Sequence, residues 1–90
     1  MAIASFNKDP EAMLDYHIDW SDWLDGDTII ASEWVTESGI SIVADKFSDT
    51  VAVVWLSGGE SRSRYEVTNR ITTSGSRIDE RTIRIKCKHK

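Results

Sequence analysis

The sequence has almost no cysteine and no long apolar run. Cys87 is the single cysteine among 90 residues, so no internal disulfide can form and no second thiol supports a zinc site. No apolar stretch approaches the roughly 20 residues that a helix needs to cross a bilayer. Residues 1–7 lack the basic start and the longer apolar run of a secretory signal peptide. These absences predict a chain without membrane contact that is synthesised in a cytoplasm.

Arrangements of side chains that perform catalysis are also missing. The two histidines, His17 and His89, have no convincing Ser–Asp partners, so no catalytic triad is indicated. The Gly58-Gly59 pair is too short to cradle a phosphate and precedes no helical pattern. Four carboxylates lie within nine residues, without the spacing of a calcium-binding EF-hand loop: Asp19, Asp22, Asp25 and Asp27. We predict no enzymatic activity, no catalytic residue, no metal site and no cofactor.

What the sequence does contain is strand patterning. Apolar residues occupy every even position of residues 14–20, which is typical of a strand with one buried face. Further strands are expected, with turn residues between them, over residues 28–36, 40–42, 50–56, 65–71 and 82–87. The only helical signal is a first turn at Pro10. We therefore expect an N-terminal arm or first turn over residues 1–13 and a single β-sandwich domain over residues 14–90.

Strand number and spacing predict the fold class. Six to seven short strands favour an all-β, immunoglobulin-like antiparallel β-sandwich. Tyr65 opens a strand after a Gly-containing loop, the place where such sandwiches anchor a tyrosine hydroxyl on nearby backbone. Trp34 is the expected large core aromatic. The predicted core consists of the inward-facing residues Tyr16, Ile18, Trp34, Val54, Leu56, Tyr65, Val67, Ile83 and Ile85.

Residues 50–56 are apolar on both faces of the expected strand. If Val54 and Leu56 face the core, then Val53 and Trp55 face outward. Exposed apolar patches commonly mark protein interfaces, in which tryptophan is enriched. We predict that Val53 and Trp55 form an interface, with a covered central strand as the alternative.

Charge is divided unevenly along the chain. Residues 1–60 hold 12 acids and 2 bases, whereas residues 61–90 hold 3 acids and 9 bases. The two halves can attract each other within one fold or between neighbouring copies. We predict that the second arrangement brings basic interface residues to the acids of a neighbour: Arg70, Arg81, Arg84 and Lys86. Nucleic acid is an unlikely partner, because the body is acidic and no aromatic residues interleave with the bases.

Several motifs, in order along the chain, resemble a family of small phage proteins that act as fiber-tail adaptors. The motifs include Lys8-Asp9-Pro10, Leu14-Asp15-Tyr16, Asp19-Trp20-Ser21, Trp55-Leu56-Ser57-Gly58-Gly59, Val67-Thr68-Asn69 and Asp79-Glu80-Arg81. The resemblance runs from about residue 8 to the C-terminus. It implies a virion component of the phage tail, made in the host cytoplasm, which joins a receptor-binding fiber or spike to the tail without catalysis.

The partners implied by the resemblance are other tail or fiber proteins. Several copies in a symmetric assembly are expected, because tails have cyclic symmetry. Two alternatives stay open at this point. One is a capsid decoration protein, and the other is a host-directed carbohydrate-binding module in which Trp23 and Trp55 stack on sugar rings.

Overall fold

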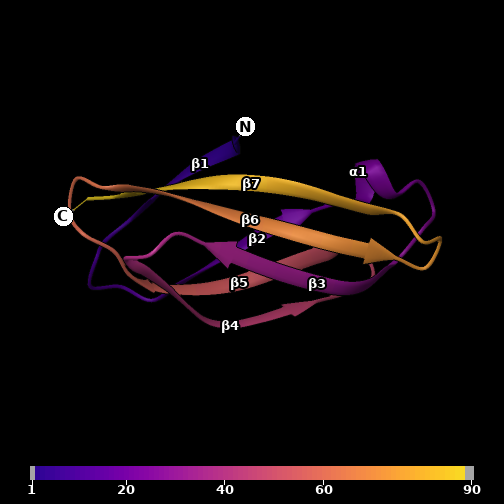
Figure 1. Cartoon of the computed structure of the whole chain (residues 1–90), viewed down its shortest axis with the longest axis horizontal. Helices are drawn as coiled ribbons and strands as arrows, with labels where there is room; N and C mark the ends of the chain where they lie inside the picture. Colours follow the sequence, from indigo (N-terminus) through magenta and orange to yellow (C-terminus); the bar gives the residue numbers. More distant parts are fainter. Residues whose placement is uncertain (1, 89–90) are drawn as a thin grey trace.

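The structure, a computed structural model, describes the backbone of residues 2–88 and the side chains of residues 4–88; His89 and Lys90 lie outside these residues. The elements are β1 (Ala2–Lys8), β2 (Leu14–Asp19), α1 (Ser21–Leu24), β3 (Ile29–Thr36), β4 (Ile40–Phe47), β5 (Val51–Gly58), β6 (Arg64–Thr73) and β7 (Ile78–Cys87). Seven strands of the described chain form two sheets, in the orders β1-β7-β6-β3 and β2-β5-β4. Figure 1 shows an elongated all-β sandwich, with α1 at one end and the end of β7 at the other.

Strict alternation of side chains creates the two layers. In β2, Tyr16 and Ile18 are buried while Asp15, His17 and Asp19 are exposed. The pattern continues in β6, whose buried residues alternate with exposed or half-buried ones over ten residues. A strand turns successive side chains to opposite faces, so each sheet has one apolar face to bury against the other.

The N-terminal segment differs from the expected arm or first turn over residues 1–13. Residues 2–8 form β1, which runs parallel to β7 and places Phe6 in register with Ile85. The side chains of Ala4 and Phe6 pack against the core. The correction has a physical reason: this short strand pairs with the last strand of the chain, and nothing local in the sequence announces so distant a partner.

Most predicted core residues lie in the buried cluster between the sheets, namely Tyr16, Ile18, Val54, Leu56, Tyr65, Val67, Ile83 and Ile85. Trp34 is different, because it is only half-buried and packs against the margin of this cluster. Trp34 lies on β3, an edge strand of its sheet, where neighbouring residues cover its side chain only in part. The large central aromatic is instead Trp20, which is 0% exposed.

A polar network lies within this core. The indole Nε1 of Trp20 donates to Asn69 Oδ1 at 2.9 Å. The amide nitrogen of Asn69 donates in turn to Ser32 Oγ at 2.9 Å and to the Glu33 carbonyl oxygen at 3.0 Å. Asn69 interrupts the apolar face of β6 in the sequence, and this network explains why. Buried polar groups are tolerated when their hydrogen-bonding capacity is satisfied.

Tyr65 fixes the start of β6 against the preceding loop. Its hydroxyl accepts a hydrogen bond from the backbone N–H of Glu60 at 3.0 Å. Gly39 lies against the same ring, where a Cβ would come within 2.9 Å of a tyrosine ring carbon, and its φ is +105°. Glycine is therefore required at this position for both space and backbone conformation. The ring of Tyr65 thus ties together the loops at the end of the sandwich opposite α1.

Candidate functional site

The outer face of the β2-β5-β4 sheet carries Val53 and Trp55. Val53 is only 6% exposed, because it stands in register between His17 of β2 and Lys46 of β4. The prediction that Val53 is part of an exposed patch is therefore wrong, and the alternative of a covered strand describes it. Trp55 is half-buried, and Lys46 Nζ lies 5.4 Å from its ring centroid. Trp55 thus offers a partly accessible indole with a cation beside it.

Arg81 lies at the α1 end of the sandwich. Its guanidinium carbon is 4.2 Å from the ring centroid of Trp20. One terminal nitrogen donates to the Asp19 carbonyl oxygen at 3.1 Å, and the other lies 3.4 Å from Asp22 Oδ1. The Arg81 side chain thereby packs over the central core aromatic of its own chain.

Arg84 also has a partner within the chain. Its guanidinium lies 3.9 Å from Glu66 Oε2 on the adjacent strand β6. Arg81 and Arg84 therefore each have an acidic partner within the chain, and their pairing with acids of a neighbouring copy stays a prediction. The other two predicted interface bases, Arg70 and Lys86, are exposed on β6 and β7.

The acidic run after β2 serves to anchor a loop. Asp27 accepts hydrogen bonds from the Ser74 hydroxyl and from the Gly75 backbone N–H, and its other oxygen lies 3.3 Å from Arg77 Nε. The hydrogen bond from Ser74, above all, holds the pKa of Asp27 well below its usual value. The loop after α1 is thereby pinned to the β6–β7 turn. Among the residues that the structure describes, no three potential metal ligands come together.

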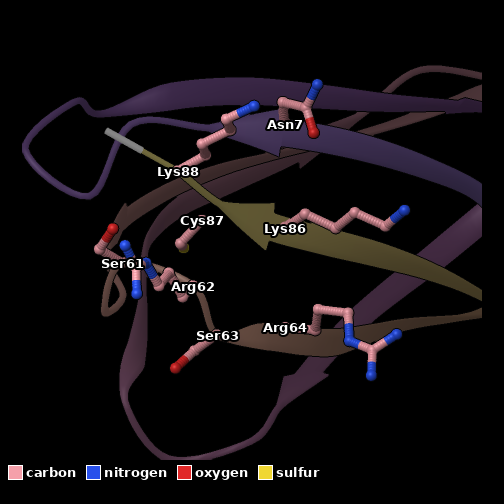
Figure 2. Close-up of a pocket in the computed structure, with 8 residues that line it drawn as sticks. All are labelled: Asn7, Ser61, Arg62, Ser63, Arg64, Lys86, Cys87 and Lys88. Atoms are coloured by element: carbon pink, nitrogen blue, oxygen red, sulfur yellow. The ribbon is translucent and has the colours of Figure 1, made fainter. Parts of the chain in front are cut away.

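A cluster of basic side chains lines a pocket at the opposite end of the molecule. The pocket has a volume of about 540 Å³ and is lined by Arg62, Arg64, Lys86 and Lys88, together with Ser61, Ser63, Asn7 and Cys87. No carboxylate is among these lining residues. Figure 2 shows the arginines coming from the loop and start of β6, and the lysines from β7 and the residue after it. The arrangement is suited to binding an anion.

Backbone hydrogen bonds hold the loop of this basic pocket in place. Arg62 N–H donates to the Cys87 carbonyl oxygen at 2.8 Å, and Cys87 N–H donates to the Ser63 carbonyl oxygen at 2.9 Å. The Cys87 side chain is buried, and burial raises the pKa of its thiol, so Cys87 is not an activated nucleophile. The pocket loop is thereby fixed against the end of β7.

Lys8, the last residue of β1, is buried. Its Nζ donates to the Gly58 carbonyl oxygen at 2.7 Å and to the Asp9 carbonyl oxygen at 2.9 Å. Burial lowers the pKa of Lys8, although neighbouring acids partly oppose this effect. Lys8 thus acts as a structural tie between the end of β1 and the end of β5.

Comparison with known proteins decides the family. Residues 8–86 match the family described as podophage GP4 fiber-tail adaptor protein gp77. The chain belongs to this family. The match confirms the resemblance seen in the sequence, and with it the role of an adaptor between fiber and tail. A search of curated proteins found no match.

Sequence reasoning located only part of the surface that this fiber-tail adaptor offers. It singled out Lys86 but missed Arg62, Arg64 and Lys88, which surround the same pocket. A signal was present, since the loop Ser61-Arg62-Ser63-Arg64 places two arginines directly before β6. Only the pairing of β6 with β7 brings them beside the two lysines.

No helix of the described residues is long and apolar enough to cross a membrane.

Proposed function

We propose that this adaptor is a non-catalytic structural component of the phage tail, present in several copies that each contact a tail protein and a fiber or spike protein. The observation that carries the proposal is the family match over residues 8–86. An elongated sandwich with extents of 41 × 23 × 20 Å suits such a role, because its two ends are far enough apart to contact different partners. The buried thiol of Cys87 and the absence of a catalytic arrangement in the sequence agree with a purely structural part.

We further propose that the sandwich is immunoglobulin-like. In immunoglobulin domains, strands B, E and D share one sheet and strands C, F and G share the other. If β1 to β7 correspond to A to G, the sheets β2-β5-β4 and β3-β6-β7 reproduce this division. The hydrogen bond from Glu60 N–H to the Tyr65 hydroxyl supports the assignment, because such a tyrosine anchors strand F in these folds.

The carbohydrate-binding alternative is not favoured by any contact in the structure. The guanidinium carbon of Arg77 lies 4.3 Å from the ring centroid of Trp23, and Lys46 stands beside Trp55. Both indoles that were candidates for stacking on sugars therefore already hold a cation against the ring. They also belong to different elements, α1 and β5.

The proposal is tested in the particle. Phage assembled without this chain should retain capsid and tail but lose fibers, and supplying the chain in trans should restore them. A cryo-EM map of the restored particle should show the chain in several symmetry-related copies between tail and fiber. Two results together would instead establish a decoration protein. They are density for the chain on the capsid surface of the restored particle, and fibers that remain attached to particles lacking the chain.

A further inference from the structure

On the outer face of β6 and β7, charged residues in register with each other carry opposite charges, with one exception. Glu66 lies opposite Arg84, and Arg70 lies opposite Glu80, so opposite charges face each other. Between these pairs, Thr68 and Thr82 lie opposite each other and share a hydrogen bond of 2.9 Å. Complementary pairs of this kind stabilise an antiparallel ladder.

The exception is the pair at the mouth of the basic pocket. Arg64 lies directly opposite Lys86, and like charges in this position destabilise a ladder. Figure 2 shows the two side chains extending in the same direction from adjacent strands. No ion pair in the described structure supplies either base with a carboxylate. The mismatch would be relieved by negative charge from outside the chain.

A second unfavourable feature lies in the same pocket. Arg62 has a φ of +69°, in the left-handed region that favours glycine. Two glycines with positive φ, Gly58 and Gly59, stand only a few residues earlier, yet an arginine occupies this tight position. Local strain of this kind gathers at binding sites when the strained residue has a role there.

From these features we infer that the basic pocket binds the carboxylates of an acidic segment of a partner protein. The inference rests on the proposed adaptor function and names the chemistry of one of its contacts. Four bases with no carboxylate among the described lining residues can hold two or more acidic side chains, and arginine can bind a carboxylate through two parallel hydrogen bonds.

An acidic polypeptide fits better than nucleic acid. The chain has a net charge of −4, so a long polyanion would leave the pocket and meet repulsion from the remaining surface. A short acidic segment is attracted locally, because charges beyond about 8 Å are screened at physiological ionic strength.

A second copy of this chain is also a less suitable occupant. Two exposed acids, Asp22 within α1 and Asp25 just after it, lie at the far end of a molecule 41 Å long. Contacts from that end into the pocket of the next copy would run head to tail along the molecule. Such contacts generate open filaments, unless the rotation that relates one copy to the next closes them into a ring.

The test is a titration of the whole chain with a fluorescently labelled hexaglutamate peptide at low salt. Arg64→Gln and Lys86→Gln should each weaken binding about fivefold, which corresponds to the loss of one exposed ion pair. The matched control is Arg70→Gln, on the same strand and the same face but in register with Glu33 and Glu80. It removes the same charge outside the pocket and should leave the affinity unchanged.

Arg62→Gly separates binding from folding. Glycine adopts positive φ without strain, so the thermal midpoint should stay the same or rise while the peptide affinity falls. Failure of the wild-type chain to bind the peptide, or equal losses in the Arg70→Gln control, would overturn the inference. So would tighter binding of a short DNA duplex, or self-association that Arg64→Gln abolishes. Because this test is made in solution and the adaptor role is tested in the particle, either can fail alone.

Discussion

Trp20 is the largest fully buried side chain of the described residues. Its ring meets that of Trp23 edge-on at a centroid distance of 5.5 Å, and Arg81 covers it. Replacing a buried large aromatic with alanine costs about 3–5 kcal/mol. In Trp20→Ala, Asn69 Oδ1 also loses its indole donor, which adds about 1–3 kcal/mol. A chain of this size is stable by roughly 5–13 kcal/mol, so we expect Trp20→Ala to be largely unfolded or close to it.

The matched comparison is Trp34→Ala. Trp34 is half-buried on an edge strand, and its indole Nε1 has no hydrogen-bond partner among the described residues. Its removal therefore breaks no hydrogen bond and empties a site that can relax towards solvent. We expect a loss of about 1–3 kcal/mol, within the usual range for single substitutions. Trp20→Phe isolates the hydrogen bond to Asn69, since it keeps an aromatic ring, and should cost at least about 1–3 kcal/mol.

Urea unfolding followed by far-UV circular dichroism measures all three variants on one scale. We expect the free energy of unfolding to be higher for Trp34→Ala than for Trp20→Ala. For any variant that still folds, the slope of this free energy against urea concentration should be unchanged. If Trp34→Ala proves as destabilising as Trp20→Ala, the assignment of Trp20 as the central core aromatic is refuted. A Trp20→Phe variant as stable as the wild type would refute the role given to the Asn69 network.

Three further outcomes are expected. Gly59→Ala should lower the thermal midpoint by several degrees, because its φ is +94° and a Cβ would meet Cys87 Sγ; an unchanged midpoint would contradict this geometry. Asp27 has a lowered pKa in the folded state, so the stability that it contributes is present above its unfolded value of 3.8 and is lost as the pH falls below it. Thermal melts at about pH 7 and pH 3 should accordingly show that the thermal midpoint falls less on acidification in Asp27→Asn than in the wild type. An equal fall of the midpoint in both proteins would show that the Asp27 contacts do not contribute to stability. Trp55→Ala should leave the monomer folded but reduce incorporation into the particle, as measured by the amount of chain in purified phage; normal incorporation would remove Trp55 from the interface.

The parts of the fold that depend on local patterning were predictable. Alternation in residues 14–20 identified β2 and the inward direction of Tyr16 and Ile18, because strand geometry alone sends every second side chain to the same face. Trp20 continues the same alternation but was not included in the predicted core. The alternation failed to rank Trp20 against Trp34, because β2 and β3 are both edge strands and burial depends on what packs over each indole, which for Trp20 is Trp23 and Arg81.

Side-chain partners across the sheets were not predictable in the same way. An apolar Val53 and a basic Arg81 both suggested exposed interface residues, yet neighbouring strands cover the first and an aromatic ring and two aspartates engage the second. The basic pocket likewise combines residues more than twenty positions apart, Arg62 and Arg64 with Lys86 and Lys88.

The amino-acid sequence by itself determined the all-β class, the position of most strands and the family of fiber-tail adaptors, because these follow from the local period of apolar residues and from motifs that are continuous in the chain. Only the tertiary structure decided that β1 joins β7, that Trp20 rather than Trp34 fills the centre, and that Arg64 faces Lys86. These features depend on the order of strands within the two sheets, and that order is set by contacts between residues far apart in the chain rather than by the preferences of any one segment.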